Sequence, residues 1–149
     1  LRFIGARDQL APSLIEKIEA AEAQTSGNKG LRLFVAVAYG GRWDIVKATR
    51  RLATRAAEGE IAPGEIDDAA LAAELELDGV PDVDLLIRTG GERRLSNFLL
   101  WNLAYAELWF CDTLWPDFGE QTFDEALEFF SKRQRRYGHT GDQVEAVNS

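Results

Sequence analysis

Several residue types on which common functional sites depend are scarce in this sequence. Its 149 residues include one cysteine, Cys111, and one histidine, His139. A single cysteine can form neither an intrachain disulfide nor a CxxC metal site, so we expect a reducing, cytoplasmic setting and a buried structural thiol. His139 lies beyond the last predicted helix, which excludes a histidine-based dyad or metal centre. No apolar run approaches the roughly 18–20 residues that span a bilayer, which excludes an integral membrane protein.

Basic residues are also in the minority, with 17 against 25 acidic ones and a formal net charge of −8. This acidity argues against non-specific nucleic-acid binding. Ten of the acids lie between Glu58 and Asp84, where there is no lysine or arginine, so the rest of the chain has 17 bases against 15 acids. We interpret the acidic stretch as a solvated helix with its flanking loops, which leaves room for a local anion site elsewhere.

Strand-like and helix-like hydrophobic patterns alternate along the chain. Apolar runs typical of strands occur at residues 2–5, 31–38, 83–88 and 108–111. A helical pattern begins at Pro12, and further helical patterns cover residues 43–57, 67–77 and 123–137. The alternation predicts an α/β fold with a mostly parallel central sheet flanked by helices. We expect one domain over residues 1–149, with residues 139–149 as a polar, flexible tail.

Three local expectations can be checked directly. The strand at 31–38 should be covered on both faces, as in a parallel sheet. The helix at 123–137 should begin with a capping box formed by Thr122 and Glu125. The inward face of the helix at 43–57 should consist of Ile45, Thr49, Leu52 and Ala56.

Two predicted strands end in glycine pairs accompanied by arginines. Tyr39-Gly40-Gly41-Arg42 follows the first, and residues 88–97 follow the second. Ligands bind at the carboxyl ends of parallel strands, where glycine N–H groups and arginine forks suit phosphate oxygens. The candidates for a phosphate or diphosphate cradle are Arg88, Arg94 and Ser96. The alternative is a surface turn whose arginines pair with the acidic stretch; neither loop fits the GxGxxG or Walker pattern.

Residues 97–118 contain seven of the fifteen aromatic residues. This density predicts that some rings face a partner subunit or an apolar substrate channel, with core packing as the alternative. Glu107 lies within the same run, where a carboxylate is costly unless it is paired, binds a metal or lines a cleft. Mg²⁺ suits it, because that ion takes one or two carboxylates together with phosphate oxygens and water. A simple salt bridge to a nearby arginine is the alternative.

Longer motifs in these segments form an ordered series. They are DLLIRTGGE at 84–92, RLSNFLLW at 94–101, AYAEL at 104–108 and LWPDF at 114–118, with RFIG at 2–5, YGGRWD at 39–44 and RRYG at 135–138. The series resembles the cis-prenyltransferases, the undecaprenyl or polyprenyl diphosphate synthases, over nearly the whole chain.

The resemblance implies a Mg²⁺-dependent transferase that condenses isopentenyl diphosphate with an allylic diphosphate such as farnesyl diphosphate, making new Z double bonds. Arg88, Arg94 and Ser96 would hold the diphosphate of isopentenyl diphosphate, with Arg42 as a further candidate, and Glu107 would be the carboxylate associated with Mg²⁺. Arg136 and Gly138 match an R-x-G element that reaches the partner's active site in family dimers. A homodimer in the cytoplasm, with transient contact to a membrane surface during product release, is therefore expected.

Two departures from the family pattern affect these expectations. Ala38 stands where the family often has asparagine before Tyr-Gly-Gly-Arg. The His-x-x-x-Asp-Gly-Asn loop, which carries the catalytic aspartate of the family, does not occur in these residues. We therefore expect the C-terminal portion of a longer enzyme, inactive by itself. The alternatives are a non-catalytic subunit of a prenyltransferase heteromer and a phosphate-binding α/β module unrelated to prenyl chemistry.

Overall fold

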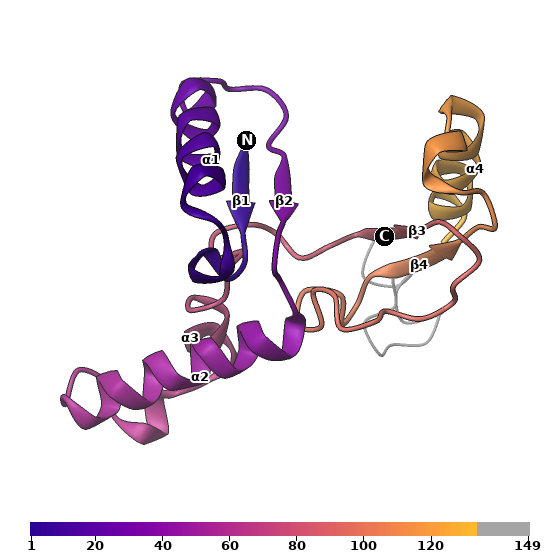
Figure 1. Ribbon diagram of the computed structural model, residues 1–149. Coiled ribbons are helices and arrows are strands. Elements are labelled where there is room, and N and C mark those ends of the chain that lie inside the picture. The colour runs from indigo at the N-terminus through magenta and orange to yellow at the C-terminus, as the bar shows by residue number, and fades with distance from the viewer. Residues whose placement is uncertain (134–149) are drawn as a thin grey trace, which may run out of the picture. The chain divides into compact units, whose positions relative to one another are not determined.

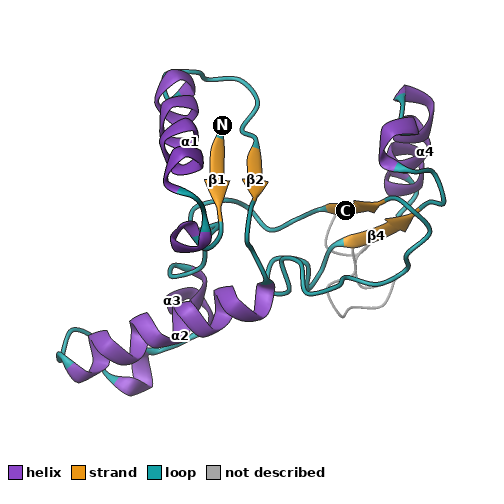
Figure 2. Ribbon diagram, viewed as in Figure 1, coloured by secondary structure: helices purple, strands orange, loops and turns teal. Residues whose placement is uncertain are grey.

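The computed structural model describes residues 1–133, which form two compact units. The first unit comprises Leu1–Val80 together with Asn97–Trp101, and the second comprises Pro81–Ser96 and the described residues from Asn102 onward. Figures 1 and 2 show the elements of each unit. The predicted tail at 139–149 and the end of the predicted last helix at 134–137 lie outside the described residues.

The first unit is built on a two-stranded parallel sheet. Strand β1 (Arg2–Ile4) pairs with β2 (Phe34–Ala36), so that Phe3 lies opposite Val35. Helix α1 (Pro12–Thr25) lies beside β1 (Figure 1) and begins at the proline that the sequence predicted. A proline suits this first helical position because its missing N–H would have no partner there.

Helices α2 (Gly41–Ala57) and α3 (Asp68–Ala72) complete the first unit and pack against each other. Short 3-10 helices lie at Arg7–Gln9 and Pro63–Glu65. Helix α3 covers only five residues of the helix that the sequence predicted over residues 67–77. The buried apolar side chains of this unit are Ile4, Ala6, Ile18, Ala48, Leu52, Leu75, Leu77 and Leu99.

The second unit repeats the parallel arrangement. Strand β3 (Leu85–Arg88) pairs in parallel with β4 (Glu107–Phe110), and α4 (Glu120–Ser131) packs against β4. A 3-10 helix at Trp115–Asp117 connects β4 to α4. Parallel strands flanked by helices confirm the predicted α/β class, and the carboxyl end of β3 opens into the loop that carries the candidate phosphate residues.

The strand predicted over residues 31–38 is shorter and less covered than expected. Only Phe34–Ala36 is a strand, and Leu31 and Leu33 are 90% and 53% exposed. Within the described residues β2 pairs with β1 alone, and apolar side chains are buried only where neighbours cover them. The prediction that this run is covered on both faces was wrong for these residues.

The predicted inward face of α2 was also wrong in part. The buried side chains are Asp44, Ala48 and Leu52, at a spacing of four, whereas Thr49 is exposed. Asp44 is buried because polar partners satisfy its carboxylate: the Tyr39 hydroxyl donates at 2.9 Å and the Glu76 backbone N–H at 3.1 Å. Periodicity assigns the inward face to apolar residues and so misses a carboxylate with such partners.

Helix α4 begins three residues before the predicted start. Its N-cap is Gly119, whose side chain cannot cap, and Thr122 and Glu125 lie inside the helix, so the predicted capping box was wrong. No helix among residues 1–133 is long and apolar enough to cross a membrane.

Candidate diphosphate site

The loop after β3 is held by its glycines in an unusual backbone conformation. Gly90 and Gly91 have φ of 82° and 77°, in the left-handed region that glycine adopts without steric cost. Their N–H groups donate at 2.9 Å to the carbonyls of Thr113 and Cys111. These N–H groups are therefore already paired, contrary to the expectation that they face an anion. The glycines instead fix the loop against the segment after β4, where Cys111 is half-buried rather than fully buried.

Arg88, at the end of β3, meets Ser96 at the far end of this loop. Its Nη1 atom donates to Ser96 Oγ at 2.8 Å and to the backbone carbonyl of Arg94. The structure thus brings together an arginine fork and a hydroxyl that are eight residues apart. Both groups suit phosphate oxygens, and their contact places two of the predicted cradle residues side by side.

The Arg94 side chain has a different partner within the same loop. Its guanidinium forms an ion pair with the Glu92 carboxylate, and the two side chains are 65% and 45% exposed. Exposed ion pairs contribute little to stability, so an incoming diphosphate could displace this one at small cost. The alternative in which these arginines pair with the acidic stretch at 58–84 is not what the structure shows for Arg94.

The first glycine pair lies in the other unit and has a packing role. A Cβ added at Gly41 would lie 2.9 Å from the Leu100 backbone nitrogen, and one at Gly40 would lie 2.7 Å from Asn97 Nδ2. The Gly41 and Arg42 N–H groups donate to Asn97, at 2.7 Å to its carbonyl and 2.8 Å to its Oδ1. These two amides are not free for an anion, and Arg42 offers an exposed side chain.

Asn97 and the Tyr39–Asp44 pair lie beside this glycine pair, and neither was predicted from the sequence. Burial, followed by the hydrogen bond from Tyr39 to Asp44, raises the pKa of the Tyr39 hydroxyl. Burial also raises the pKa of the Asp44 carboxyl, against the opposing effect of its hydrogen bonds. The tyrosine therefore stays protonated and donates. The available signal was the position of Asp44, four residues before Ala48 and eight before Leu52, on the buried face of the helix.

Glu107, the first residue of β4, accepts a hydrogen bond from Arg133 Nε at 2.9 Å. The Glu107 side chain is 18% exposed, and the Arg133 guanidinium also lies 5.3 Å from the Phe129 ring centroid. Of the alternatives for this carboxylate, pairing with an arginine is the one observed. Among residues 1–133 no group of three acidic, histidine or cysteine side chains could hold a metal. Glu107 therefore suits Mg²⁺ as a single carboxylate ligand. Phosphate oxygens, water and other ligands would fill most positions of the ion's coordination sphere.

Several of the clustered aromatic rings are exposed. Trp115 is 73% and Tyr105 66% exposed, while Phe98 is 38% exposed. The Trp115 ring stacks on Phe118 with centroids 5.7 Å apart. Core packing therefore does not account for all of the aromatic residues in this segment. Arg136 and Gly138 lie outside the described residues.

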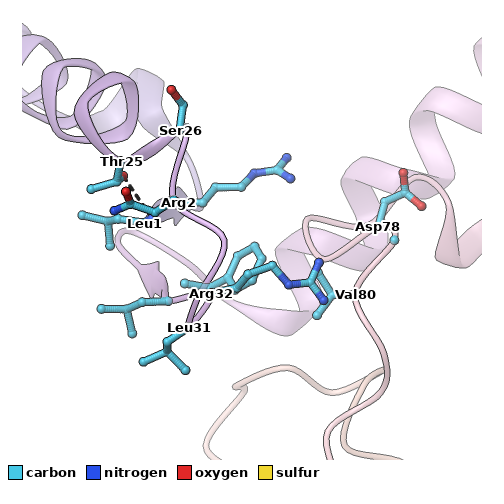
Figure 3. A pocket seen from close by; sticks show the side chains of 12 residues that line it. Leu1, Arg2, Thr25, Ser26, Leu31, Arg32, Asp78 and Val80 are labelled. Atoms are coloured by element: carbon cyan, nitrogen blue, oxygen red, sulfur yellow. Dashed lines mark hydrogen bonds between the residues drawn. The ribbon is translucent and has the colours of Figure 1, made fainter.

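A separate hollow in the first unit holds none of the predicted site residues. It has a volume of about 520 Å³ and is lined by side chains that include Arg2, Arg32 and Asp78 (Figure 3). The Leu1 amino group donates to Thr25 Oγ1 at 3.1 Å at its edge. The residues suited to diphosphate binding lie in the loop after β3 instead.

Comparisons with known proteins agree with the motif series. Residues 1–138 match the family described as putative undecaprenyl diphosphate synthase. The chain is 50% identical over 146 residues to the ditrans,polycis-undecaprenyl-diphosphate synthase, (2E,6E)-farnesyl-diphosphate specific, of Escherichia coli K12, covering 97% of this chain and 58% of that protein. It is 51% identical over 140 residues to the enzyme of the same name from Pectobacterium atrosepticum, covering 94% of this chain and 55% of that protein.

Two solved structures share the fold. Lavandulyl diphosphate synthase from Lavandula x intermedia, in complex with dimethylallyl diphosphate, matches with a TM-score of 0.89 and 41% identity, covering 93% of this chain and 59% of that one. A probable undecaprenyl diphosphate synthase from Campylobacter jejuni matches with a TM-score of 0.78 and 35% identity, covering 92% and 62%. The chain spans slightly more than half the length of the curated relatives it matches. By its motifs, its fold and these matches, the chain belongs to the undecaprenyl diphosphate synthase family, the cis-prenyltransferases.

Proposed function

We propose that the whole protein condenses isopentenyl diphosphate with an allylic diphosphate such as farnesyl diphosphate, and that this chain supplies the site for the isopentenyl diphosphate. The observation that carries the proposal is the contact between Arg88 Nη1 and Ser96 Oγ at the end of β3. An arginine fork and a hydroxyl at the end of a parallel strand provide hydrogen-bond donors for phosphate oxygens.

Each of the candidate residues has a defined part in this proposal. Arg88 and Ser96 bind the diphosphate as a pre-formed pair, and Arg94 exchanges Glu92 for a phosphate oxygen. Arg42 is a further cation for the same diphosphate. In the reaction, a carbon–carbon bond forms between the two substrates, the allylic C–O bond breaks, diphosphate leaves and a proton is lost from the isopentenyl unit. Fixed cations favour this step because they stabilise charge as it develops.

Glu107 is the residue that would hold Mg²⁺ in this proposal. The bound ion would neutralise diphosphate oxygens as a Lewis acid. The Glu107 carboxylate would orient it from β4, after release from Arg133. Glu107 alone does not complete a coordination sphere, so the other ligands would be diphosphate oxygens, water and groups outside residues 1–133.

The remaining proposals concern the whole protein. We propose a cytoplasmic homodimer in which Arg136 and Gly138 reach the partner's site, with transient contact to a membrane surface during product release. The 149 residues lack the His-x-x-x-Asp-Gly-Asn loop of the family, and we propose that they do not turn over substrate alone. The identity to enzymes named as synthases favours catalysis over a non-catalytic subunit.

The test is incorporation of labelled isopentenyl diphosphate by the whole protein. Arg88→Ala and Arg94→Ala should each raise the KM for isopentenyl diphosphate at least about tenfold, since each removes a charge-assisted hydrogen bond to substrate. Arg93→Ala is the matched control, because it removes the same charge from the same loop without touching the proposed cradle. Unchanged KM values in Arg88→Ala and Arg94→Ala would overturn the site. Intact binding with no turnover would indicate the non-catalytic subunit.

A further inference from the structure

Asn97 ties the residue that follows Ser96 to the first turn of α2. Its backbone carbonyl accepts the Gly41 N–H at 2.7 Å, and its side-chain Oδ1 accepts the Arg42 N–H at 2.8 Å. The first N–H groups of a helix have no partner within the helix. One residue, 55 positions away from Arg42 in the sequence, thus caps two of these groups at once.

The backbone at this point adopts a conformation that does not persist unaided. Ser96, Asn97 and Leu99 have φ of 51°, 63° and 42°, all in the left-handed region. Residues with a Cβ are disfavoured there, asparagine least among them. Such strained runs persist only where surrounding contacts hold them. The two hydrogen bonds from α2 to Asn97 are contacts of this kind.

Packing fixes the residues after Asn97 on the same helix end. The Gly41 position is so close to Leu100 that a Cβ would lie 2.8 Å from its Cγ. The Phe98 ring meets the Tyr39 ring edge-on, with centroids 6.0 Å apart and an interplanar angle of 80°. Tyr39 is itself held by its hydrogen bond to buried Asp44. Asn97 is therefore held by hydrogen bonds to α2, and its neighbours Phe98 and Leu100 pack against Tyr39 and Gly41.

We propose that Asn97 is a positioning residue for isopentenyl diphosphate binding. Ser96 is bonded directly to Asn97, and both residues have left-handed backbones. Loss of the hydrogen bonds that hold Asn97 would therefore free the backbone of its neighbour Ser96, whose hydroxyl accepts from Arg88. Asn97 does not need to contact substrate for this effect. It makes the Arg88–Ser96 pair available before the diphosphate arrives. This inference rests on the proposed function of that pair.

Two substitutions separate the cap from the backbone conformation. Asn97→Gly keeps left-handed freedom and removes only the side-chain acceptor, whereas Asn97→Ala removes the acceptor and adds the left-handed penalty. Asp67→Gly is the matched control, because the Asp67 side chain caps α3 by accepting the Ala70 N–H at 2.8 Å, at a helix end that does not hold Ser96. All are measured in the whole protein, with circular dichroism to confirm folding.

We expect Asn97→Gly to raise the KM for isopentenyl diphosphate about two- to twelvefold, the range that corresponds to loss of one hydrogen bond. The kcat and the KM for the allylic substrate should change less than about twofold, as expected when binding of the substrate and of the transition state weakens equally. Asn97→Ala should raise the KM at least as far, and Asp67→Gly should not change it. If Asn97→Ala does not fold, the KM of Asn97→Gly for isopentenyl diphosphate is the test of the proposal.

The outcomes separate this inference from the function on which it rests. A wild-type KM in Asn97→Gly, with a raised KM in Arg88→Ala, would overturn the positioning role and leave the diphosphate site standing. A wild-type KM in Arg88→Ala would overturn the site itself. An equal rise in Asp67→Gly and Asn97→Gly would show a general effect of lost stability and would also overturn the positioning role.

Discussion

The Glu107 carboxylate and Arg133 Nε lie 2.9 Å apart, joining the first residue of β4 to the residue two positions beyond α4. The pair is unequal in exposure, with Glu107 18% and Arg133 54% exposed. The only candidate metal carboxylate singled out in the sequence therefore has a cationic partner that can move into water. Any cation that binds Glu107 competes with this arginine.

If Glu107 holds Mg²⁺ as proposed, replacing Arg133 should change how the activity of the whole protein depends on Mg²⁺. We expect Arg133→Gln to lower the Mg²⁺ concentration for half-maximal activity a few-fold, because the carboxylate no longer has to leave a guanidinium. Glu107→Gln should raise that concentration. Titration of activity against Mg²⁺ measures both. Lys132→Gln removes the neighbouring cation, which pairs with Glu128, and should have no effect. A raised requirement in Arg133→Gln would contradict the competition.

Ala38 is a place where a smaller residue should stabilise the protein. Its φ is 49°, in the left-handed region that costs a residue with a Cβ about 1–2 kcal/mol. Ala38→Gly removes this cost and adds the smaller entropic cost of glycine, for a net gain of about 0.5–1 kcal/mol. The midpoint of urea unfolding checks it. Ala36→Gly, in β2, is the control and should destabilise.

Gly41→Ala should destabilise the protein by about 1–3 kcal/mol, the usual range for overpacking. The added Cβ would lie 2.9 Å from the Leu100 backbone nitrogen, which is not free to rotate away as a side chain would be. Gly64→Ala is the matched control, because nothing lies within 4 Å of the added atom, and its effect should stay within about 0.5 kcal/mol. Equal unfolding midpoints for the two variants would contradict the packing role of Gly41.

The pair of Lys47 and Glu76 should make stability depend on pH. Burial alone raises the pKa of the Glu76 carboxyl, but hydrogen bonds from Lys47 and from the Gly5 N–H outweigh it and hold the pKa below its ordinary value. The stabilisation is therefore complete above the ordinary carboxyl range of about pH 4–5 and is lost as the pH falls through the lowered pKa.

Lys47→Met tests this pair. It should destabilise the protein by about 1–3 kcal/mol at pH 7, the range for a hydrogen bond to a charged group. The difference from wild type should narrow as the pH falls below 4, leaving the part due to the Trp43 ring, which lies 4.8 Å from Lys47 Nζ. Urea unfolding at several pH values measures it. If the difference in unfolding free energy widens below pH 4, the pKa of Glu76 is not lowered in the way that this prediction requires.

Local sequence patterns determined a large part of this protein. The start of α1 at Pro12, the parallel α/β class and the loop that joins Arg88 to Ser96 follow from periodicity, helix signals and motifs within short segments. These features are local because a helix, a strand or a turn is specified mainly by residues a few positions apart. The motif series also identified the family, which the comparisons confirmed.

The pairing of polar groups that lie far apart in the sequence could not be predicted and is known from the three-dimensional structure alone. The partner of Glu107 lies 26 residues away, and the cap of α2 comes from Asn97, 55 residues beyond Arg42. Periodicity placed Thr49 inside and missed Asp44, because a buried carboxylate is tolerated only where distant donors satisfy it. Folding brings such donors to the carboxylate from distant parts of the chain, and a local sequence pattern does not predict them. The glycines at 40–41 show the same limit: their sequence suggested an anion site, while the approach of Leu100 and Asn97 gives them a packing role.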